Sequence, residues 1–418
     1  KVTLVTPKKG PRWRWTWTGP RRVRHVIGDS REGWSEALRI CLEAYAGRGL
    51  MPVFDYSAIR PFGAPIKTFG GTASGPEALR ELLEVDIPEI LGTPGKRITS
   101  GQIVDVMNAI GKCVVAGGAR RSAEIALGRH DDEEFITLKA DKEKVMKWRW
   151  ASNNSINAPV SLTDYSRFAD LIVKSGGEPG FVWLENCQQY GRFADGYRGD
   201  DMGILGMNPC SEIGLEDGEL CNLAVTTPAR CDNLDEFLRV LRCAYLYAKT
   251  VTLLTMPWSI TNDVIRRNRR IGISMAGIVQ NIALRGKDEH YRWCDLGYKM
   301  LRGLDLETSE RWKVAISIRL TTIKPDGTNV LMSGAFPGIH HPEAEHIIRR
   351  VNFPKLSELV AMLEAAGYFG EDNAYEATST SGAKSRVIEF PVRETNFSKC
   401  KRDVTMREQL ELVAEHQF

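Results

Sequence analysis

Segments of helical and of extended periodicity alternate along this 418-residue chain. Helical patterns start at Ser30, near Ser100, at Asn233 and at Pro354, and glycines at 47, 117–118 and 367 are placed to end three of them. Apolar stretches of strand length lie between the helices, at 51–56, 271–274, 320–323 and 387–392. Because this order is typical of sheets covered by helices, we predict an α/β fold.

Apolar stripes indicate which face each helix buries. The stripe of the first helix includes Cys41, and that of the second is formed by Ile103, Met107 and Ile110, with Cys113 at its end. A free cysteine in such a stripe usually behaves as a small core residue. We therefore expect both cysteines to pack in the core rather than to react.

Length and composition exclude several classes of protein. A chain of 418 residues allows one large α/β unit or two domains, and a net charge of +3 argues against a globally basic nucleic-acid-binding protein. Nine cysteines without a Cys-x-x-Cys pair fit neither a secreted disulfide framework nor a structural zinc site. No apolar run approaches the roughly 20 residues of a membrane span, and no secretory signal is recognisable. We expect a soluble, cytoplasmic protein.

The segment 208–212 (Asn-Pro-Cys-Ser-Glu) places an amide, a thiol and a carboxylate at alternate positions, and Cys221 follows 11 residues after Cys210. In an extended segment alternate side chains share one face. There Cys210 can carry a thiolate or a radical, Glu212 can move a proton and Asn208 can hydrogen-bond hydroxyl groups. A loop around a buried thiol is the simpler alternative, and for an isolated cysteine it would be the better interpretation.

Three other clusters have plain structural interpretations. Residues 1–22 are basic and rich in Trp, which suits an edge strand or a disordered lead as well as a nucleic-acid-binding arm. The arginine run at 266–270 leads directly into a strand-like segment, so no nucleic-acid site is expected there. His340, His341 and His346 lack a carboxylate spaced to complete a familiar metal motif, so we predict a surface turn and no metal site.

The surrounding sequence changes the interpretation of the thiol segment. Asn-Pro-Cys-x-Glu followed by Glu-x-Cys-Asn-Leu at 219–223 resembles the finger loop of ribonucleotide reductases. The likeness is closest to the adenosylcobalamin-dependent ribonucleoside-triphosphate reductases of class II. It extends, in the same order, through the motifs at 29–34, 69–76, 118–124, 150–155, 268–274, 324–328 and 387–391. A chance resemblance over so many ordered motifs is not credible.

The resemblance implies a ten-stranded α/β barrel with the loop that carries Cys210 threaded through its centre. The barrel would occupy 23–418, with an effector-site region at 23–130 and an active-site region at 131–418, after the basic, Trp-rich segment 1–22. Segments that the family has before and after this part are not matched. We therefore expect the barrel to be incomplete at both ends, and a longer protein or a companion chain to complete it.

The resemblance also implies reduction of ribonucleotides, as triphosphates, to 2′-deoxyribonucleotides. Adenosylcobalamin would be the radical source, and Cys210 would become the thiyl that takes hydrogen from C3′. Glu212 would accept the proton of the 3′-hydroxyl, and Asn208 would hold the ribose hydroxyls. Cys221 would be one of two reducing thiols, recharged by a thioredoxin-like reductant. None of the other cysteines lies in the context of the second thiol.

Nucleotide sites follow from the same likeness. Substrate phosphates, carried with Mg²⁺, would bind a turn of Pro325, Asp326, Gly327 and Thr328, although an ordinary Pro-Asp-Gly turn is the simpler alternative. Asp326 stands where the family usually has Ser or Thr. A deoxynucleoside triphosphate or ATP would act as allosteric effector on Asp29, Ser30, Arg60 and Lys67, and its identity would be reported through a specificity loop of Gly117, Gly118, Arg120, Arg121 and Ser122.

Other functions remain open from the sequence. The same barrel could be served by a separate radical-generating metallosubunit, but that needs a tyrosine relay, and no adjacent Tyr pair is present. The chain could also be a non-catalytic, effector-binding half of a split reductase, working as a homodimer or with a companion chain. A nucleic-acid-binding module is a third hypothesis and rests on 1–22 alone.

Overall fold

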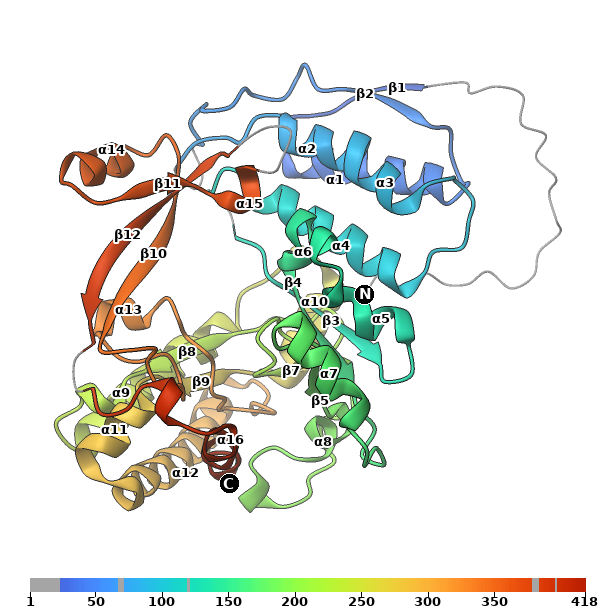
Figure 1. Ribbon diagram of the computed structural model, residues 1–418. Helices are drawn as coiled ribbons and strands as arrows, with labels where there is room; N and C mark the ends of the chain where they lie inside the picture. Colours follow the sequence, from blue (N-terminus) through green and yellow to red (C-terminus); the bar gives the residue numbers. More distant parts are fainter. Residues whose placement is uncertain (1–22, 67–70, 119–120, 378–382, 395–396) are drawn as a thin grey trace.

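A computed structural model describes residues 23–66, 71–118, 121–377, 383–394 and 397–418 (Figure 1). Helices and strands alternate as expected, so the α/β prediction is confirmed. The described strands form five separate sheets of two or three strands each, and they do not close into a barrel. The predicted segment 1–22 lies outside the described residues.

The N-terminal part packs one helical layer on a short parallel sheet. Strands β1 (Val23–Val26) and β2 (Pro52–Asp55) pair with each other in parallel. Helix α1 (Arg31–Tyr45) connects them in the sequence. Ser30 caps α1 by accepting a hydrogen bond from the Gly33 backbone N–H. A Cβ atom at Gly33 would lie 2.4 Å from the Gly28 carbonyl oxygen, so the tight entry into α1 requires glycine. As predicted, Cys41 is buried in the core with helices α2 (Glu77–Glu81), α3 (Ile87–Leu91) and α4 (Ser100–Val115).

Helix α4 forms where its sequence predicted, but it buries a different face. A capping box at Thr99 and Gln102 starts it. Ile103 and Met107 are 45% and 41% exposed, which contradicts the predicted stripe. The buried face instead carries Asp105, whose carboxylate pairs with Arg149 from a distant turn. The helix is thus rotated relative to the simple apolar stripe and carries this ion pair on its buried face beside the core residues Val106 and Ala109, while the expected core position of Cys113 is confirmed.

A second layer is a parallel sheet of β3 (Glu124–Arg129), β4 (Ser152–Asn157) and β5 (Gly180–Val182). Its connections contain α5 (Glu133–Thr137), α6 (Lys142–Lys147) and α7 (Ser166–Ser175), and α8 (Leu184–Gln189) follows β5. Phe135, Ile156 and Phe168 form the core between the sheet and these helices.

A third layer pairs β8 (Leu223–Thr226) with β9 (Gly272–Met275), again in parallel. Helices α9 (Leu234–Val251), α10 (Ser259–Asn268), α11 (Ile278–Arg285) and α12 (Lys287–Trp312) follow these strands, and α9 and α12 share a core. The strand predicted at 320–323 is reduced to one bridge, Ile273 to Thr321. Two backbone hydrogen bonds, 2.8 and 3.1 Å long, still hold this segment beside β9.

The C-terminal part carries an antiparallel sheet in the order β10 (His346–Pro354), β12 (Ser385–Arg393), β11 (Gly370–Asp372). The prediction that a helix starts at Pro354 is wrong: Pro354 ends β10 opposite Ser385, and α14 (Glu358–Ala365) begins after Ser357. Nine-residue pairing with β12 outweighs the local helix-start signal of proline, because a strand end does not need its N–H. Short helices α13 (Val330–Ser333) and α15 (Ala374–Ala377) and the last helix α16 (Met406–Glu415) complete this part.

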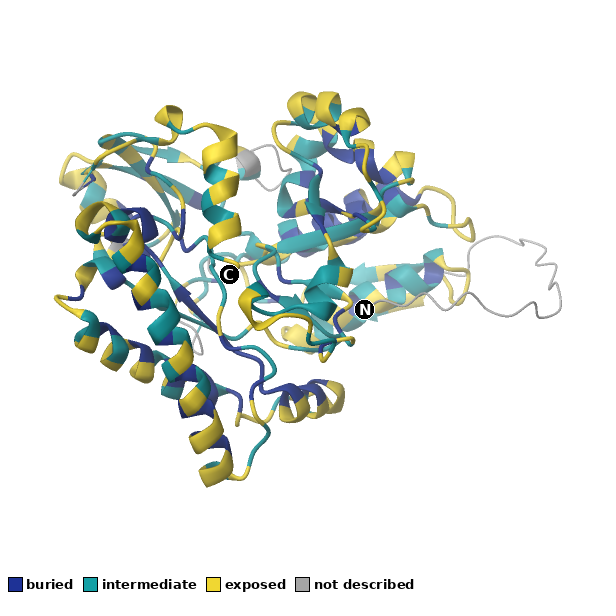
Figure 2. Ribbon diagram, turned by 90° about the horizontal axis from the view of Figure 1, so that it is seen from below, coloured by how far each residue is buried: buried dark blue, intermediate teal, exposed yellow. Residues whose placement is uncertain are grey.

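Burial follows this layering: buried residues line the surfaces between helices and sheets, and the outer helix faces are exposed (Figure 2). Across the described ranges, no helix is both long and apolar enough to cross a bilayer.

Candidate active site

The predicted thiol loop is the tip of a small hairpin. Strands β6 (Gly206–Met207) and β7 (Gly214–Leu215) pair in antiparallel fashion, and residues 208–213 connect them. The buried Asn208 holds the turn together, because its Oδ1 accepts hydrogen bonds from the backbone N–H groups of Glu212 and Ile213, both 3.1 Å long. Ser211 adopts a left-handed conformation with φ of 62°. The turn therefore presents Cys210 at its exposed tip.

The second thiol lies against the same turn. The Asn208 Nδ2 donates a hydrogen bond to the Cys221 Sγ at 3.4 Å. Burial, followed by the charge of Glu212, raises the pKa of Cys221 to about 11, and the same two causes raise the pKa of Cys210. The positive charge of Lys324 opposes both shifts. Both sulfurs thus hold their protons near neutral pH, in a site shared with Glu212 and Lys324.

Glu212 has a carboxylate oxygen without a partner. Its Oε2 is buried and has no hydrogen-bond partner within the described ranges, while its backbone oxygen accepts a hydrogen bond from the Thr322 hydroxyl. An unpaired buried oxygen is costly in a folded protein. Such an atom at the side of two thiols is suited to accept a hydrogen bond or a proton from a bound molecule.

Two neighbouring sheets hold the loop in place. Asn153 of β4 donates to the Pro209 carbonyl oxygen at 2.8 Å. At the start of β9, a Cβ atom on Gly272 would lie 2.8 Å from Thr322 and 3.4 Å from Ile213, so glycine lets the loop approach β9 closely. The hairpin therefore lies between the sheet of β3–β5 and the strands β8 and β9.

The predicted phosphate turn reaches the same site. The Lys324 backbone N–H donates to the Ser274 hydroxyl of β9 at 2.8 Å. The side chain of Asp326 is 1% exposed, and its Oδ1 lies 3.0 Å from the Lys324 Nζ without the alignment of a hydrogen bond. A Cβ atom on Gly338 would lie 2.5 Å from the Lys324 carbonyl oxygen, so this glycine makes room for the turn. Gly327 and Thr328 are exposed.

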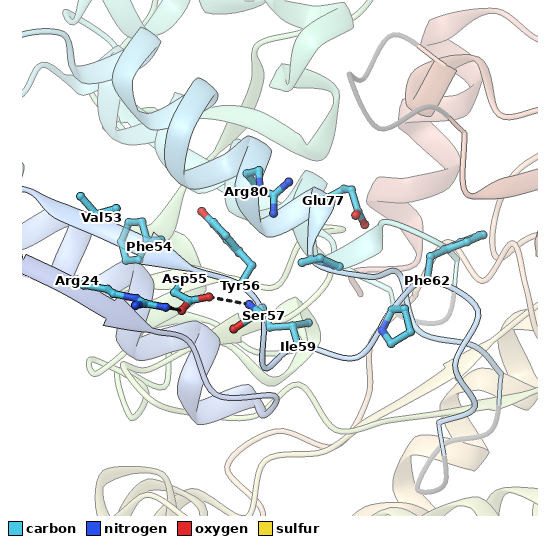
Figure 3. A pocket seen from close by; sticks show the side chains of 12 residues that line it. Arg24, Val53, Phe54, Asp55, Tyr56, Ser57, Ile59, Phe62, Glu77 and Arg80 are labelled. Carbon is cyan, nitrogen blue, oxygen red and sulfur yellow. Dashed lines mark hydrogen bonds and ion pairs between the residues drawn. The ribbon is translucent and has the colours of Figure 1, made fainter.

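The predicted effector residues lie at the ends of β1 and β2. Asp29 Oδ2 and Arg60 Nε form an ion pair 2.7 Å long, and the Ser30 hydroxyl is used as the cap of α1. Lys67 lies outside the described residues. Beside them, a cavity of about 840 Å³ is bounded by β1, β2 and α2 (Figure 3). Aromatic and charged side chains line it, among them Arg24, Phe54, Asp55, Tyr56, Phe62, Glu77 and Arg80.

The predicted specificity loop connects α4 to β3. Gly117 and Gly118 have φ of 80° and 69°, conformations that favour glycine. A Cβ atom on Gly118 would lie 3.3 Å from the nitrogen of Pro354, the last residue of β10. The loop therefore passes close to the C-terminal end of that strand. Arg121 and Ser122 are exposed, and Arg120 lies outside the described residues.

Sequence reasoning missed several residues that build the site. Asn153, Thr322 and Ser274 hold the loop and the turn, and Arg270 pairs internally with Asp201. Asn153, Ser274 and Arg270 belong to motifs noted in the sequence, but no role followed from residue type alone. In the part of the chain that the structure covers, no three His, Cys, Asp or Glu residues are grouped to hold a metal ion.

None of the cysteines is in a disulfide. Cys41, Cys113 and Cys231 are buried in the core, whereas Cys187, Cys294 and Cys400 are half-buried. The exposed cysteines are Cys210, Cys221 and, on α9, Cys243. The second reducing thiol that the resemblance requires is therefore not assigned to a residue of this chain.

Comparison with known proteins identifies the same family as the sequence motifs. Residues 12–91 match the family described as B12-dependent ribonucleotide reductase, insertion domain. The chain is 43% identical over 393 residues to the adenosylcobalamin-dependent ribonucleoside-triphosphate reductase of Euglena gracilis, with 94% of this chain and 53% of the relative aligned. It is 37% identical to the Lactobacillus leichmannii protein of the same name, over 89% of this chain and 54% of the relative.

The fold agrees as well. A crystal structure of B12-dependent (class II) ribonucleotide reductase superimposes with a TM-score of 0.78 at 34% identity, covering 95% of this chain and 59% of that chain. The chain spans about half the length of the curated relatives it matches. Over nearly all of its own length, this chain is thus a homologue of the adenosylcobalamin-dependent ribonucleoside-triphosphate reductases, which confirms the resemblance of its motifs.

Proposed function

We propose that this chain forms the thiol-bearing part of an adenosylcobalamin-dependent ribonucleotide reductase that acts on ribonucleoside triphosphates. The observation that carries the proposal is the shared site of Cys210, Cys221 and Glu212, in which two protonated thiols lie beside an unpaired carboxylate oxygen. Hydrogen-atom transfer needs an S–H group, and proton transfer needs a free oxygen. The loop offers both.

The chemistry divides between the loop and the substrate. Adenosylcobalamin supplies the radical when it is bound, and the exposed Cys210 sulfur fits a large group that approaches from outside the loop. As a thiyl, Cys210 takes the C3′ hydrogen, and Glu212 accepts the proton of the 3′-hydroxyl. One of two thiols protonates the 2′-hydroxyl, which leaves as water, and the pair then gives a hydrogen to C2′ and an electron to the C3′ carbonyl as it becomes a disulfide. Glu212 returns its proton to O3′, and Cys210 returns the hydrogen to C3′. Cys221 is one of those thiols, and a thioredoxin-like protein would reduce the disulfide.

Asn208 and the phosphate turn would position the nucleotide. Asn208 already uses its side chain to hold the loop, so contact with ribose hydroxyls requires it to share these hydrogen bonds. In the turn, the charge of Lys324 is partly neutralised by Asp326, so Mg²⁺ carried with the triphosphate would supply further positive charge. The pairing of Asp29 with Arg60 would give way to a deoxynucleotide effector, with the loop after α4 linking the two sites.

The remaining strands of a ten-stranded barrel and the second reducing thiol would come from a longer protein or a companion chain. Two observations support this: the chain covers about half of its relatives, and the described sheets are open. Region 23–130 would then serve the effector and region 131–418 the active site.

Anaerobic turnover tests the proposal. The chain, together with the complementary half of a relative, is incubated with CTP or ATP, adenosylcobalamin, a dithiol and a deoxynucleotide effector. Deoxynucleotide should form, and Cys210→Ala should abolish its formation. The matched control Cys243→Ala, at an exposed position of α9, should leave it unchanged. Equal product from the Cys210→Ala protein would contradict the proposal.

A non-catalytic, effector-binding half is the second candidate, because no other cysteine of the chain lies in the sequence context of the second reducing thiol. Binding of a deoxynucleoside triphosphate, lost in Arg60→Ala, without product formation in any of these mixtures would favour it.

A further inference from the structure

Arg270 contacts the segment that leads into the hairpin of β6 and β7 and the segment that follows it, here called the two arms of the hairpin. Its side chain, 1% exposed, lies immediately before Ile271 and β9. The Nη1 and Nη2 atoms donate to the two carboxylate oxygens of Asp201 at 2.7 and 2.6 Å, and the Nε lies 3.0 Å from the Oε1 of Glu219 as an ion pair, without the alignment of a hydrogen bond. Asp201 precedes β6, and Glu219 stands two residues before Cys221. One guanidinium thus bridges the chain that enters the hairpin and the chain that leaves it.

The neighbouring residues hold Glu219 in one orientation. The Asn268 Nδ2 donates to Glu219 Oε1 at 3.0 Å and to Glu216 Oε1 at 2.8 Å, and the Glu216 backbone N–H donates to Glu219 Oε2 at 2.9 Å. The Glu219 side chain is 2% exposed and that of Asp201 is fully buried. Water therefore has little access to replace the guanidinium.

Asp201 has a second cationic neighbour. The Nε of Arg319 lies 3.4 Å from Asp201 Oδ2, but Arg319 directs its Nη1 to Asp200 at 2.9 Å. Only Arg270 joins Asp201 to Glu219 among the ion pairs of the described residues.

We infer that Arg270 is a positioning residue for the Cys221 thiol. The inference rests on the proposed function only for the role of that thiol in reduction. The contact between Cys221 and Asn208 joins the two arms, so its length depends on how far apart the arms are. Arg270 sets that separation from the opposite side, at Asp201 and Glu219.

The geometry requires arginine rather than any cation. A guanidinium presents a planar fork that satisfies one carboxylate with two hydrogen bonds while its Nε faces another. A lysine ammonium is a single point charge and cannot reproduce both contacts at once. In Arg270→Lys one carboxylate loses its contact with the cation that joins the two segments, and the segment that carries it is no longer tied to the other.

The test measures the chemical reactivity of Cys221 in the full chain. Iodoacetamide alkylation of Cys221 is followed by peptide mass spectrometry against pH, with the exposed Cys243 of the same molecule as internal reference. Cys221 is exposed in part, yet burial of its thiol is the largest cause of its raised pKa. Release of the arm should therefore lower that pKa, although the Asn208 hydrogen bond, a smaller cause that lowers it, is lost as well. A fall of one unit raises the thiolate fraction, and with it the ratio of Cys221 to Cys243 labelling, about tenfold.

Matched variants separate positioning from general stability. Arg267→Lys changes an ion pair to Glu216 whose arginine is 58% exposed, and it should leave the labelling ratio unchanged. Glu219→Gln removes one charge with little change of shape and should raise the ratio as Arg270→Lys does. In the double variant the ratio should not exceed that of the stronger single variant, because both act through one contact.

Thermal unfolding confirms that each variant is folded. A labelling ratio that stays at the wild-type value in folded Arg270→Lys, or effects of Arg270→Lys and Glu219→Gln that multiply, would overturn the inference. If Arg270→Lys does not fold, Glu219→Gln alone decides: an unchanged ratio contradicts the inference. Because labelling needs no turnover, a failed reductase assay leaves this result independent.

Discussion

Asn208 has a structural task that its position in the motif does not reveal. Its Oδ1 closes the turn by accepting two backbone hydrogen bonds, and its Nδ2 contacts the Cys221 sulfur. One buried amide therefore determines the shape of the loop and also the environment of the second thiol.

Replacing Asn208 by Ala or Asp should separate these two tasks. Asn208→Ala leaves two backbone N–H groups without acceptors and should lower the free energy of unfolding by about 2–5 kcal/mol. Asn208→Asp keeps the acceptors, so it should cost less, but it places a carboxylate at Cys221, raises the pKa of that thiol further and slows its alkylation. Urea unfolding and iodoacetamide labelling check the two expectations.

Asn153→Ala serves as control, since it removes one hydrogen bond to the same loop and should cost only about 1 kcal/mol. Equal destabilisation by Asn208→Ala and Asn208→Asp would show that the two backbone contacts are not what holds the turn.

At the scale of elements, α16 is attached to α12 through two histidines. The Nε2 atoms of His290 and His416 lie 2.9 Å apart, and the His416 Nδ1 lies 2.7 Å from the Leu412 carbonyl oxygen. Since a carbonyl only accepts, His416 carries its proton on Nδ1, and His290 must donate from Nε2. Asn281 Nδ2 then donates to His290 Nδ1 at 2.9 Å. Both rings are neutral in this arrangement, because a further proton would remove an acceptor.

Acid should therefore loosen α16. Burial lowers the pKa of His290 to about 3 and also lowers that of His416. Because the pKa is lower when α16 is docked than when it is undocked, the undocked state binds protons at a higher pH. The free energy that docks α16 is therefore fully present above pH 6.5 and decreases as the pH falls from there toward 3. The loss that His290 contributes should be about 1.4 kcal/mol per pH unit, and His416 should add to it in the same direction.

Hydrogen exchange of the α16 backbone between pH 7.5 and 5.5, corrected for intrinsic rates, measures this loss. The other groups packed there are Cys294, 3.5 Å from His290, and Lys287 and Tyr291, which both contact Glu415. His416→Gln should flatten the pH dependence of exchange in α16. His346→Gln, at an exposed position of β10, should leave it unchanged. A wild-type profile that is flat over this range would contradict the histidine link.

At the scale of the whole molecule, a buried ion pair connects the third layer. Lys249 of α9 and Asp305 of α12 are 0% and 1% exposed and lie 2.7 Å apart. Asp305 also accepts hydrogen bonds from the Tyr245 hydroxyl at 2.9 Å and the Ser317 backbone N–H at 2.8 Å. Ser317 lies just before the 320–323 segment, whose Thr322 holds the thiol loop.

Asp305→Asn should leave the buried Lys249 charge uncompensated. We expect a loss of about 3–5 kcal/mol in unfolding free energy, measured by urea denaturation, and faster labelling of Cys221 as the loop loosens. Asp295 of the same helix has a side chain that is 38% exposed and pairs with Arg192 and Lys299, so Asp295→Asn should cost less, about 1 kcal/mol. Equal costs for the two substitutions would show that the buried pair does not stabilise this layer.

Local signals in the sequence determined much of the architecture. Ser30, Thr99 and Asn233 accept the capping hydrogen bonds of α1, α4 and α9, and the alternation of helix and strand set the α/β class. The sequence also indicated that Cys210, Glu212 and Cys221 lie close together, because they are at most 11 residues apart around one hairpin. These features depend on contacts between residues close in the chain.

Only the tertiary structure decided which groups pair across the molecule. The face that α4 buries follows from Asp105 meeting Arg149, and Pro354 ends a strand because β12 lies beside it. The arginine run at 266–270, which was expected only to lead into a strand, places Arg270 in the interior between Asp201 and Glu219. Burial makes such distant ion pairs and hydrogen bonds decisive, and their partners cannot be identified until the chain has brought them together.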